Sequence, residues 1–290
     1  MIQQTMEEII MEPEIHLKSL GLALAGSERE KAKEQLKKLM KEKCDLIESV
    51  EPCTDSQCAL SMVSKSGAGM LLISGTGSCC QLINPDGVAR QCGGWGNILG
   101  DEGSAYWISY KAIKIIFDHE DGLVKSSHDI AYIKKAVNVY FEIEDKMSLM
   151  DIFYSKFDIR KVAGFCVEVA KGATEVKDGL CLYVFDEAGR YLAKHITAQL
   201  PSVSEEMLSA SGGLQVVCVG SVFKSWDLLR KGFIDVLQGY SEKGKLKEIS
   251  LLRLTQSVAI GAAFHGARTV NQILPIEYDK NYSVFLNMKF

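Results

Sequence analysis

A glycine-rich stretch between two apolar runs is the first part of the sequence whose residue types could do chemistry. Residues 71–73 predict a buried strand, Gly75-Thr76-Gly77-Ser78 follows, and residues 79–83 predict a second strand that ends at a turn. Backbone N–H groups around glycines can form a concave anion site, and the hydroxyls of Thr76 and Ser78 would add donors. The pattern therefore indicates either a phosphate-binding loop at the tip of a β-hairpin or a glycine-rich turn.

This loop matches neither of the two common nucleotide-binding motifs. A P-loop needs a lysine after its last glycine, and a dinucleotide-binding loop needs a third glycine and a following helix. The loop at 75–78 has no such lysine, and a strand is expected after it. A phosphate site here would have to use a hairpin tip instead of the start of a helix.

A second glycine-rich segment, "CGGWGNILGDEGSAYW", occupies residues 92–107. Glycines at 93, 94, 96, 100 and 103 would let the backbone approach a ligand closely. Trp95 offers a flat apolar face, and Asp101 and Glu102 offer acceptors for hydroxyl groups, which is what a sugar needs. The alternative is that Asp101 is a turn residue and that both acids favour the start of a helix at Ser104. The entropy lost by ordering so many glycines favours the functional interpretation.

Two shorter stretches have signals that are weak when taken alone. Asp55 stands ahead of a short apolar helix, where it is either an N-cap or, together with the other stretches, a general base for a hydroxyl proton. Residues 214–220 predict a buried strand that leads through Gly220 and Ser221 into a helix from about residue 222. This geometry is typical both of nucleotide contacts and of ordinary α/β connections.

The elements that must position these residues are strands mixed with long helices. Strands are expected over 17–25 and near 46–47, with a charged helix between them that has Ser27 as its N-cap. Residues 125–200 predict helices throughout, including one from about 180 to 200. A last helix is expected over 251–270, where small residues predict a closely packed neighbour.

A Ser/Gly-rich break at residues 64–69 is the best candidate for a domain boundary. We therefore expect a small N-terminal lobe over 1–66 and a large lobe over 67–290, with a helical insertion at about 125–200. The fold class predicted from this mixture is α/β.

Composition and charge restrict the possible partners. The net charge of -4 argues against a general nucleic-acid-binding protein, which needs basic surface to displace counterions. The sequence lacks an apolar run long enough to span a membrane, and its N-terminus lacks the pattern of a signal peptide, so a cytoplasmic protein is expected. The 9 cysteines lack metal-ligand spacing and are expected to be buried free thiols, with no metal-binding residues among them.

These stretches together resemble the eukaryotic N-acetyl-D-glucosamine kinases, sugar kinases of the actin-like ATPase (ribonuclease H-like) fold and of the BadF/BadG type. The resemblance is carried, in order, by "SLGLALAG", "LLISGTGS", "LINPDG", "CGGWG", "GDEGSAYW", "AGFC" and "CVGSV". It implies a two-lobe protein that phosphorylates a small-molecule amino sugar at its 6-hydroxyl with ATP and Mg²⁺, and it implies a homodimer.

The resemblance also implies a role for each candidate residue. Thr76, together with Gly75, Gly77 and Ser78, would contact the phosphates of ATP, and Ala163, Gly220 and Ser221 would border the adenosine. Asp55 would be the catalytic base for the sugar 6-hydroxyl. Gly94, Trp95, Gly96 and Asp101 would line the sugar site with it.

One feature of the family is missing from the sequence. The family has an acidic, glycine-rich first phosphate loop near its N-terminus, and no such loop is present here. We therefore expect the chain to be N-terminally truncated, its first lobe to be incomplete and its kinase activity to be impaired. After Asp55, "SQC" also replaces the small residues "AAG" of better-known members.

Two other interpretations stay open at this point. One is a different enzyme of the same fold, such as a glucosamine kinase or a dehydratase-activating ATPase, whose iron–sulfur cluster would have to use cysteines such as Cys79 and Cys92. The other is a non-catalytic isoform that binds sugar or forms a dimer. The sequence also leaves open whether N-acetylglucosamine or N-acetylmannosamine is preferred.

Overall fold

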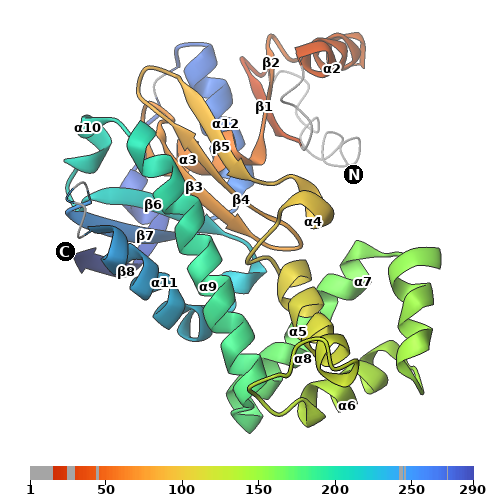
Figure 1. The fold of residues 1–290 in the computed structure, drawn as a ribbon. Coiled ribbons are helices and arrows are strands. Elements are labelled where there is room, and N and C mark those ends of the chain that lie inside the picture. The colour runs from red at the N-terminus through yellow and green to blue at the C-terminus, as the bar shows by residue number, and fades with distance from the viewer. Residues whose placement is uncertain (1–15, 25–29, 44–45, 242–243, 245, 273) are drawn as a thin grey trace. The chain divides into compact units, whose positions relative to one another are not determined.

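The computed structural model describes residues 16–24, 30–43, 46–241, 244, 246–272 and 274–290 (Figure 1). Contacts group the chain into two compact units, each with its own sheet. Unit 1 comprises Met1–Gly69 with Arg253–Ser283, and unit 2 comprises Met70–Leu252 with Val284–Phe290.

Unit 1 is built around a two-stranded parallel sheet of β1 (Leu20–Ala23) and β2 (Val50–Cys53). Parallel strands need a crossover connection, and α2 (Glu30–Lys43) supplies it. The chain then enters α3 (Asp55–Val63) directly after β2. Ser27, the expected N-cap of the charged helix, lies outside the described residues.

Helix α12 (Val258–Thr269) packs closely against β1 and α3, as its small residues predicted. A Cβ atom on Gly21 of β1 would lie 1.8 Å from the backbone oxygen of Ala262. A Cβ atom on Gly261 would lie 2.0 Å from the backbone oxygen of Cys58 in α3. Glycine is therefore needed at both contacts, because any side chain would force the elements apart.

Unit 2 contains a six-stranded sheet in the order β5-β4-β3-β6-β7-β8 (Figure 1). The three central strands β3, β6 and β7 are parallel, and β4 and β5 are antiparallel. The strands are β3 (Gly69–Ser74), β4 (Ser78–Ile83), β5 (Ala89–Gly93), β6 (Leu214–Val219), β7 (Glu248–Leu254) and β8 (Tyr282–Lys289). The expected hairpin is confirmed, since β3 and β4 are adjacent and only residues 75–77 connect them.

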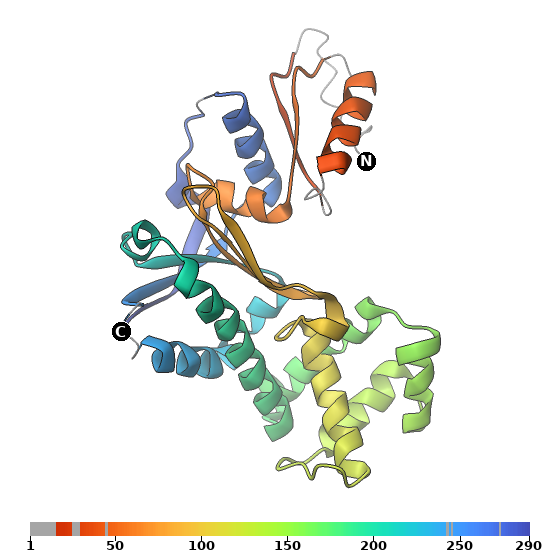
Figure 2. The same ribbon diagram turned by 45° about the horizontal axis from the view of Figure 1, so that its top comes forward.

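The expected helical region is also confirmed, although it is interrupted more often than the sequence indicated. Helices α5 to α8 cluster at one end of α9 in both views (Figures 1 and 2). They are α5 (Ala105–Glu120), α6 (Ala131–Phe141), α7 (Ile159–Gly164), α8 (Cys166–Lys171) and α9 (Gly179–Gln199). Short 3₁₀ and π turns join them at Lys146–Ser148, Asp151–Ser155 and Gly172–Val176.

The remaining helices cover or connect the strands of unit 2. They are α4 (Gly96–Leu99), the 3₁₀ turn Leu200–Ser202, α10 (Glu205–Leu208), the 3₁₀ turn Ser221–Ser225 and α11 (Trp226–Ser241). Helices α9 and α11 cross at glycines, because a Cβ atom on Gly189 would lie 2.0 Å from the backbone oxygen of Leu229. One further 3₁₀ turn, Tyr278–Lys280, belongs to unit 1.

Three sequence-based boundaries are wrong. Residues 251–254 were expected to begin the last helix, but they end β7, whose Leu251 and Leu252 are buried like residues of a central parallel strand. The strand expected near 46–47 begins at Val50, and Ile47 forms only an isolated bridge with Leu17. The helix expected from residue 222 begins as a 3₁₀ turn and becomes α-helical at Trp226.

The division into units differs from the expected lobes at the C-terminal end. The sequence suggested that all of 67–290 forms one lobe, whereas residues 253–283 group with unit 1. The physical reason is α12, whose small-residue face buries itself on β1 and α3.

Candidate nucleotide and sugar site

The predicted phosphate loop lies between β3 and β4, and its carbonyl oxygens are tied to the start of α5. The N–H of Ala105 donates to the oxygen of Gly75 at 2.8 Å, and the N–H of Gly75 donates to the oxygen of Gly77 at 2.9 Å. Thr76 at the tip is exposed. The loop is thus fixed from behind while its threonine hydroxyl faces solvent, where it can reach a ligand.

Residues 101–103 accept hydrogen bonds from the residues on either side of this loop. The N–H of Ser78 donates to Oδ1 of Asp101 at 3.0 Å, and Oγ of Ser78 donates to the oxygen of Glu102 at 2.7 Å. On the neighbouring strand, Oγ of Ser74 donates to the oxygen of Gly103 at 2.8 Å. The residues that flank the loop, Ser74 and Ser78, therefore donate three hydrogen bonds to residues 101–103.

Asp101 lies in the turn before α5, as one of the two interpretations expected, since the N–H of Ser104 donates to its backbone oxygen at 3.1 Å, but its burial was not indicated by the sequence. It is 5% exposed and adopts φ 63°, which is unusual for a residue other than glycine. A Cβ atom on Gly77 would lie 2.9 Å from both of its carboxylate oxygens. The observed contact of Asp101 is therefore with the phosphate loop, and its contact with a sugar stays a prediction.

The Gly220-Ser221 turn lies directly beside the phosphate loop. Strands β3 and β6 are parallel neighbours, so their carboxyl ends reach the same edge of the sheet. A Cβ atom on Gly220 would lie 2.0 Å from the oxygen of Ser74 and 2.9 Å from the nitrogen of Gly75. Both residues of the turn are exposed. The structure thus brings two of the predicted nucleotide-contacting segments together, at the edge where open α/β sheets bind ligands.

The predicted sugar-contacting segment follows β5, on the other side of the hairpin. A Cβ atom on Gly94 would lie 2.9 Å from Cβ of Cys79, which belongs to the adjacent strand β4. Trp95 is 66% exposed, so its ring is available to a ligand. Gly94 and Gly96 both have positive φ, at 75° and 85°.

Helix α9 supports this segment through residues that the sequence did not connect with it. A Cβ atom on Gly93 would lie 2.4 Å from Nε2 of His195, and one on Gly103 would lie 2.9 Å from the oxygen of Ala188. The Nδ1 of His195 is 2.7 Å from the oxygen of Tyr191. His195 is buried, and nothing in its sequence context pointed to Gly93.

Ala163 is placed away from solvent within α7. It is 6% exposed and belongs to the main hydrophobic core of unit 2. Its predicted position at the border of the adenosine is not tested by any contact of the described residues and stays a prediction.

Asp55 is the first residue of α3 in unit 1, and its neighbours form a capping box. Oγ1 of Thr54 accepts the N–H of Gln57 at 3.1 Å, and Oε1 of Gln57 accepts the N–H of Thr54 at 3.1 Å. Since Thr54 satisfies the helix end, Asp55 is not needed as the N-cap. Its side chain is exposed, as a proton acceptor for a bound hydroxyl would have to be.

Two buried thiols flank Asp55. The sulfurs of Cys53 and Cys58 are 2.7 Å apart, and both residues are fully buried. The hydrogen bond to Cys53, reinforced by burial, raises the pKa of Cys58, so this thiol keeps its proton. The pair therefore packs as hydrogen-bonded thiols beneath the turn that carries Asp55.

The cysteines considered for an iron–sulfur cluster lie on neighbouring strands. Cys79 of β4 faces Gly93, and Cys92 of β5 faces Cys80. Burial, followed by the charges of Asp101 and Cys92, raises the pKa of Cys79 to about 11. Cluster ligands are thiolates, so this environment does not favour the cysteine as a ligand. Within the described ranges, no three His, Cys, Asp or Glu side chains form a group that could hold a metal ion.

In the part of the chain that the structure describes, no helix has the length and apolar character needed to cross a membrane.

Comparisons with known proteins identify relatives of this chain. A model of the BadF/BadG/BcrA/BcrD ATPase family matches residues 1–266. An N-acetylmuramic acid/N-acetylglucosamine kinase of Clostridium acetobutylicum is 25% identical over 227 residues, which are 73% of this chain and 72% of that protein. An N-acetyl-D-glucosamine kinase of Dictyostelium discoideum is 32% identical over 109 residues, which are 37% of this chain and 34% of that protein.

A solved structure supports the same fold class. An N-acetylglucosamine kinase candidate from Chromobacterium violaceum superposes with a TM-score of 0.60 at 22% identity, over 84% of this chain and 74% of that chain. The predicted α/β, actin-like ATPase fold is therefore confirmed. The relatives include bacterial as well as amoebal proteins, so they do not restrict the resemblance to the eukaryotic kinases.

Proposed function

Because the chain belongs to the BadF/BadG/BcrA/BcrD ATPase family, we propose that it transfers a phosphoryl group from ATP to the 6-hydroxyl of N-acetyl-D-glucosamine. The names of the Clostridium acetobutylicum and Dictyostelium discoideum relatives support an amino-sugar kinase. The single observation that carries the proposal is the pairing of the loop at 75–78 with the turn at Gly220, side by side at the carboxyl edge of the sheet.

ATP would bind at this edge through backbone groups and hydroxyls. The exposed Thr76 would donate to a phosphate oxygen, and the exposed Gly220-Ser221 turn would lie against the nucleoside. Phosphoryl transfer depends mainly on positioning and on stabilising charge, so a loop fixed from behind by α5 and residues 101–103 suits this role.

Asp55 would accept the proton of the 6-hydroxyl as that oxygen attacks the phosphorus. The capping box leaves its carboxylate uncommitted, and its exposed position lets a substrate reach it. Gly94, Trp95 and Gly96 would line the sugar, with the indole ring against the apolar face of the pyranose.

Mg²⁺ would accompany the nucleotide. This ion is commonly held by one or two carboxylates together with substrate phosphates and waters. Two acidic residues contact the loop: Asp101, one of whose carboxylate oxygens accepts from Ser78, and the half-buried Glu102, which contacts Ser78 through its backbone oxygen. These residues fit an ion carried largely by the phosphates, whose chemistry would be to neutralise their negative charge.

Replacement of Asp55 by asparagine tests the proposal. Asp55→Asn should lower the rate of sugar phosphorylation about 10²- to 10⁴-fold, because asparagine cannot accept the proton. Sugar affinity, measured by calorimetry, should change little. Asp227→Asn is the matched control, since Asp227 is also an acidic residue in the first turn of a helix. Unchanged phosphorylation by the Asp55→Asn variant would remove Asp55 as the base.

Assays of the unsubstituted chain provide a second test of the proposal. ATP-dependent phosphorylation of N-acetylglucosamine supports a kinase, and comparison with N-acetylmannosamine and glucosamine defines the preferred sugar. Sugar binding without phosphorylation would instead indicate the non-catalytic isoform that binds sugar.

We further propose a cytoplasmic homodimer. The described cysteines are free, which suits a reducing compartment in which ATP is available. Sedimentation velocity of the purified chain and fractionation of cells would test the two parts of this proposal separately.

A further inference from the structure

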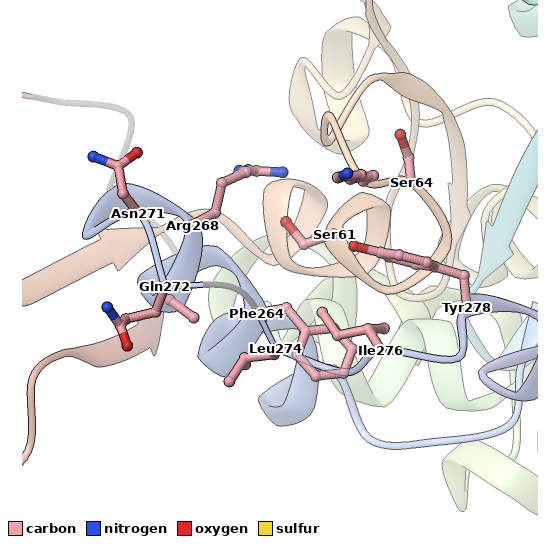
Figure 3. Close-up of a pocket in the computed structure, with 11 residues that line it drawn as sticks. Ser61, Ser64, Phe264, Arg268, Asn271, Gln272, Leu274, Ile276 and Tyr278 are labelled. Carbon is pink, nitrogen blue, oxygen red and sulfur yellow. The ribbon is translucent and has the colours of Figure 1, made fainter.

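A cavity of about 370 Å³ opens in unit 1, away from every residue assigned above (Figure 3). It lies between the C-terminal end of α3, the C-terminal end of α12 and the segment that leads to Tyr278. Asp55 is at the other end of α3, and a nine-residue helix is about 13.5 Å long. The cavity is therefore a separate feature from the proposed base.

Two cations line this cavity. Arg268 of α12 and Lys65, just after α3, both line it. Among the residues that the structure describes, neither side chain has a carboxylate within ion-pair distance. Two positive charges beside one cavity repel each other, so an anion between them would be favoured.

Contacts with His265 and Gly67 hold the side chain of Arg268 in place. Its Nη2 lies 3.0 Å from Nδ1 of His265, one turn earlier on the same helix. Gly67 packs against the guanidinium of Arg268 and has φ 75°. A Cβ atom on Gly67 would lie 2.4 Å from Nη1 of Arg268. Burial and the charge of Arg268 lower the pKa of His265, so the histidine stays neutral and can accept the hydrogen bond.

The opposite side of the cavity is apolar. Phe264, Leu274 and Ile276 form it, and Figure 3 shows them gathered below Arg268. The hydroxyl groups of Ser61 and Tyr278 point toward the same space as the guanidinium. Ser61 donates its proton to the oxygen of Gln57, so toward a ligand its oxygen is an acceptor. The cavity therefore combines a cationic side with an apolar side and has the volume of a small-molecule site.

From this arrangement we propose that the cavity binds a small organic anion. Its carboxylate or phosphate group would lie between Arg268 and Lys65, and a ring-sized body would lie against Phe264 and Ile276. Arginine can bind either group through two parallel N–H bonds. The proposal does not depend on kinase activity.

Binding of four probes to the full chain, followed by NMR or calorimetry, tests the chemistry. Phenyl phosphate and benzoate should bind, and their order of affinity identifies the preferred anion. Benzyl alcohol and inorganic phosphate should bind at least about tenfold more weakly, because each lacks one half of the ligand. Equal affinity for phenyl phosphate and either of these two probes would overturn the proposal, as would no binding of any anion.

Variants locate the binding. Arg268→Gln should weaken binding of the better anion about tenfold, and Lys65→Gln, at an exposed position, should weaken it less. Arg230→Gln, at an exposed position of α11, is the matched control and should change nothing. Thr76→Ala should also leave the affinity unchanged. A loss with Thr76→Ala would place the probe in the phosphate loop and overturn the proposal. Unchanged affinity in both Arg268→Gln and Lys65→Gln would do the same, and Lys65→Gln decides alone if the arginine variant does not fold.

Discussion

The turn that carries Asp55 and the loop that carries Thr76 are held in place in different ways. The Asp55 turn is fixed by its own neighbours, through the capping box of Thr54 and Gln57. The Thr76 loop is fixed by residues far along the chain, since Ser78 binds Asp101 at a separation of 23 residues and Ser74 binds Gly103 at a separation of 29. A local signal positions the proposed base, and tertiary contacts position the proposed phosphate loop.

This difference has a consequence for how each region tolerates change. A cap contributes about 1 kcal/mol and acts mainly on its own helix. The Thr76 loop is held by several hydrogen bonds to residues 101–105, so a side chain added at a closely packed neighbour such as Gly220 can disturb several of these bonds at once. The two regions should therefore respond to substitution with effects of different size.

The largest effect is expected at Gly220. Gly220→Val should lower the free energy of unfolding by about 3 kcal/mol or more, because its Cβ would lie 2.0 Å from the oxygen of Ser74 and its φ is 118°. Urea unfolding followed by circular dichroism measures the change. Gly75→Ala is the matched control, since a Cβ at position 75 meets no atom within 4 Å. Equal stability of the two variants would show that close packing of Gly220 against Ser74 does not stabilise the loop at 75–78.

A smaller effect is expected at Asp101. Asp101→Ala should cost about 2–3 kcal/mol, because the N–H of Ser78 loses its acceptor and alanine is unfavourable at φ 63°. Asp101→Asn keeps an acceptor and tolerates this backbone conformation, so it should cost about 1 kcal/mol or less. The difference between the two variants in the free energy of unfolding, measured with urea, reports the contribution of the acceptor for Ser78 and of the backbone conformation at position 101. If asparagine is as damaging as alanine, the negative charge matters more than the hydrogen bond.

The local region should respond less. Thr54→Ala should destabilise α3 by about 1 kcal/mol, because the N–H of Gln57 loses its acceptor. Thr54→Ser should have an effect of only a few tenths of that size, since serine is an equally good cap. Hydrogen exchange of the α3 amides reports this effect without requiring the whole chain to unfold. A loss as large as that of Gly220→Val would contradict the contrast drawn between the two regions.

The same contrast explains which elements could be predicted from the sequence. Strong local patterns gave correct elements, such as the hairpin around 75–77 and the helix expected at 180–200, which is observed at Gly179–Gln199. The turn after β4 is also as expected, with the N–H of Gly87 donating to the oxygen of Asn84. In each case the information lies within a few residues of the element itself.

Features that depend on distant partners could not be predicted. Nothing near Asp101 indicates that its acceptor role is for Ser78, because glycine-rich loops have no periodicity that reports their neighbours. The leucine-rich segment at 251–254 is too short to distinguish a strand from a helix, and the pairing of Leu251 and Leu252 with β6 makes it part of a strand. The cavity at Arg268 is likewise formed by segments on either side of unit 2 in the sequence.

The smallest predicted effect is a pH dependence at Cys79, which lies at the hairpin beside Asp101. Burial, followed by the charges of Asp101 and Cys92, raises the pKa of Cys79 from the ordinary thiol value of 9.0 to about 11 in the folded chain. The protonated thiol is thus favoured by folding. Its contribution to stability is fully present below the unfolded pKa and is lost as the pH rises from there through about 11.

Cys79→Ala should therefore lose less stability than the unchanged chain between about pH 9 and pH 11. Cys79 is only half-buried, so solvent screening should keep the difference below about 1 kcal/mol. Urea unfolding at several pH values measures it, and Cys166→Ala serves as a control, because burial alone raises the pKa of Cys166 to about 12. Asp101→Asn should reduce the Cys79 effect and leave the Cys166 effect unchanged, since Asp101 raises the pKa of Cys79 only. If Asp101→Asn alters both effects equally, the charge of Asp101 is not coupled to the hairpin thiol, and Asp101 acts through its hydrogen bond with Ser78 alone.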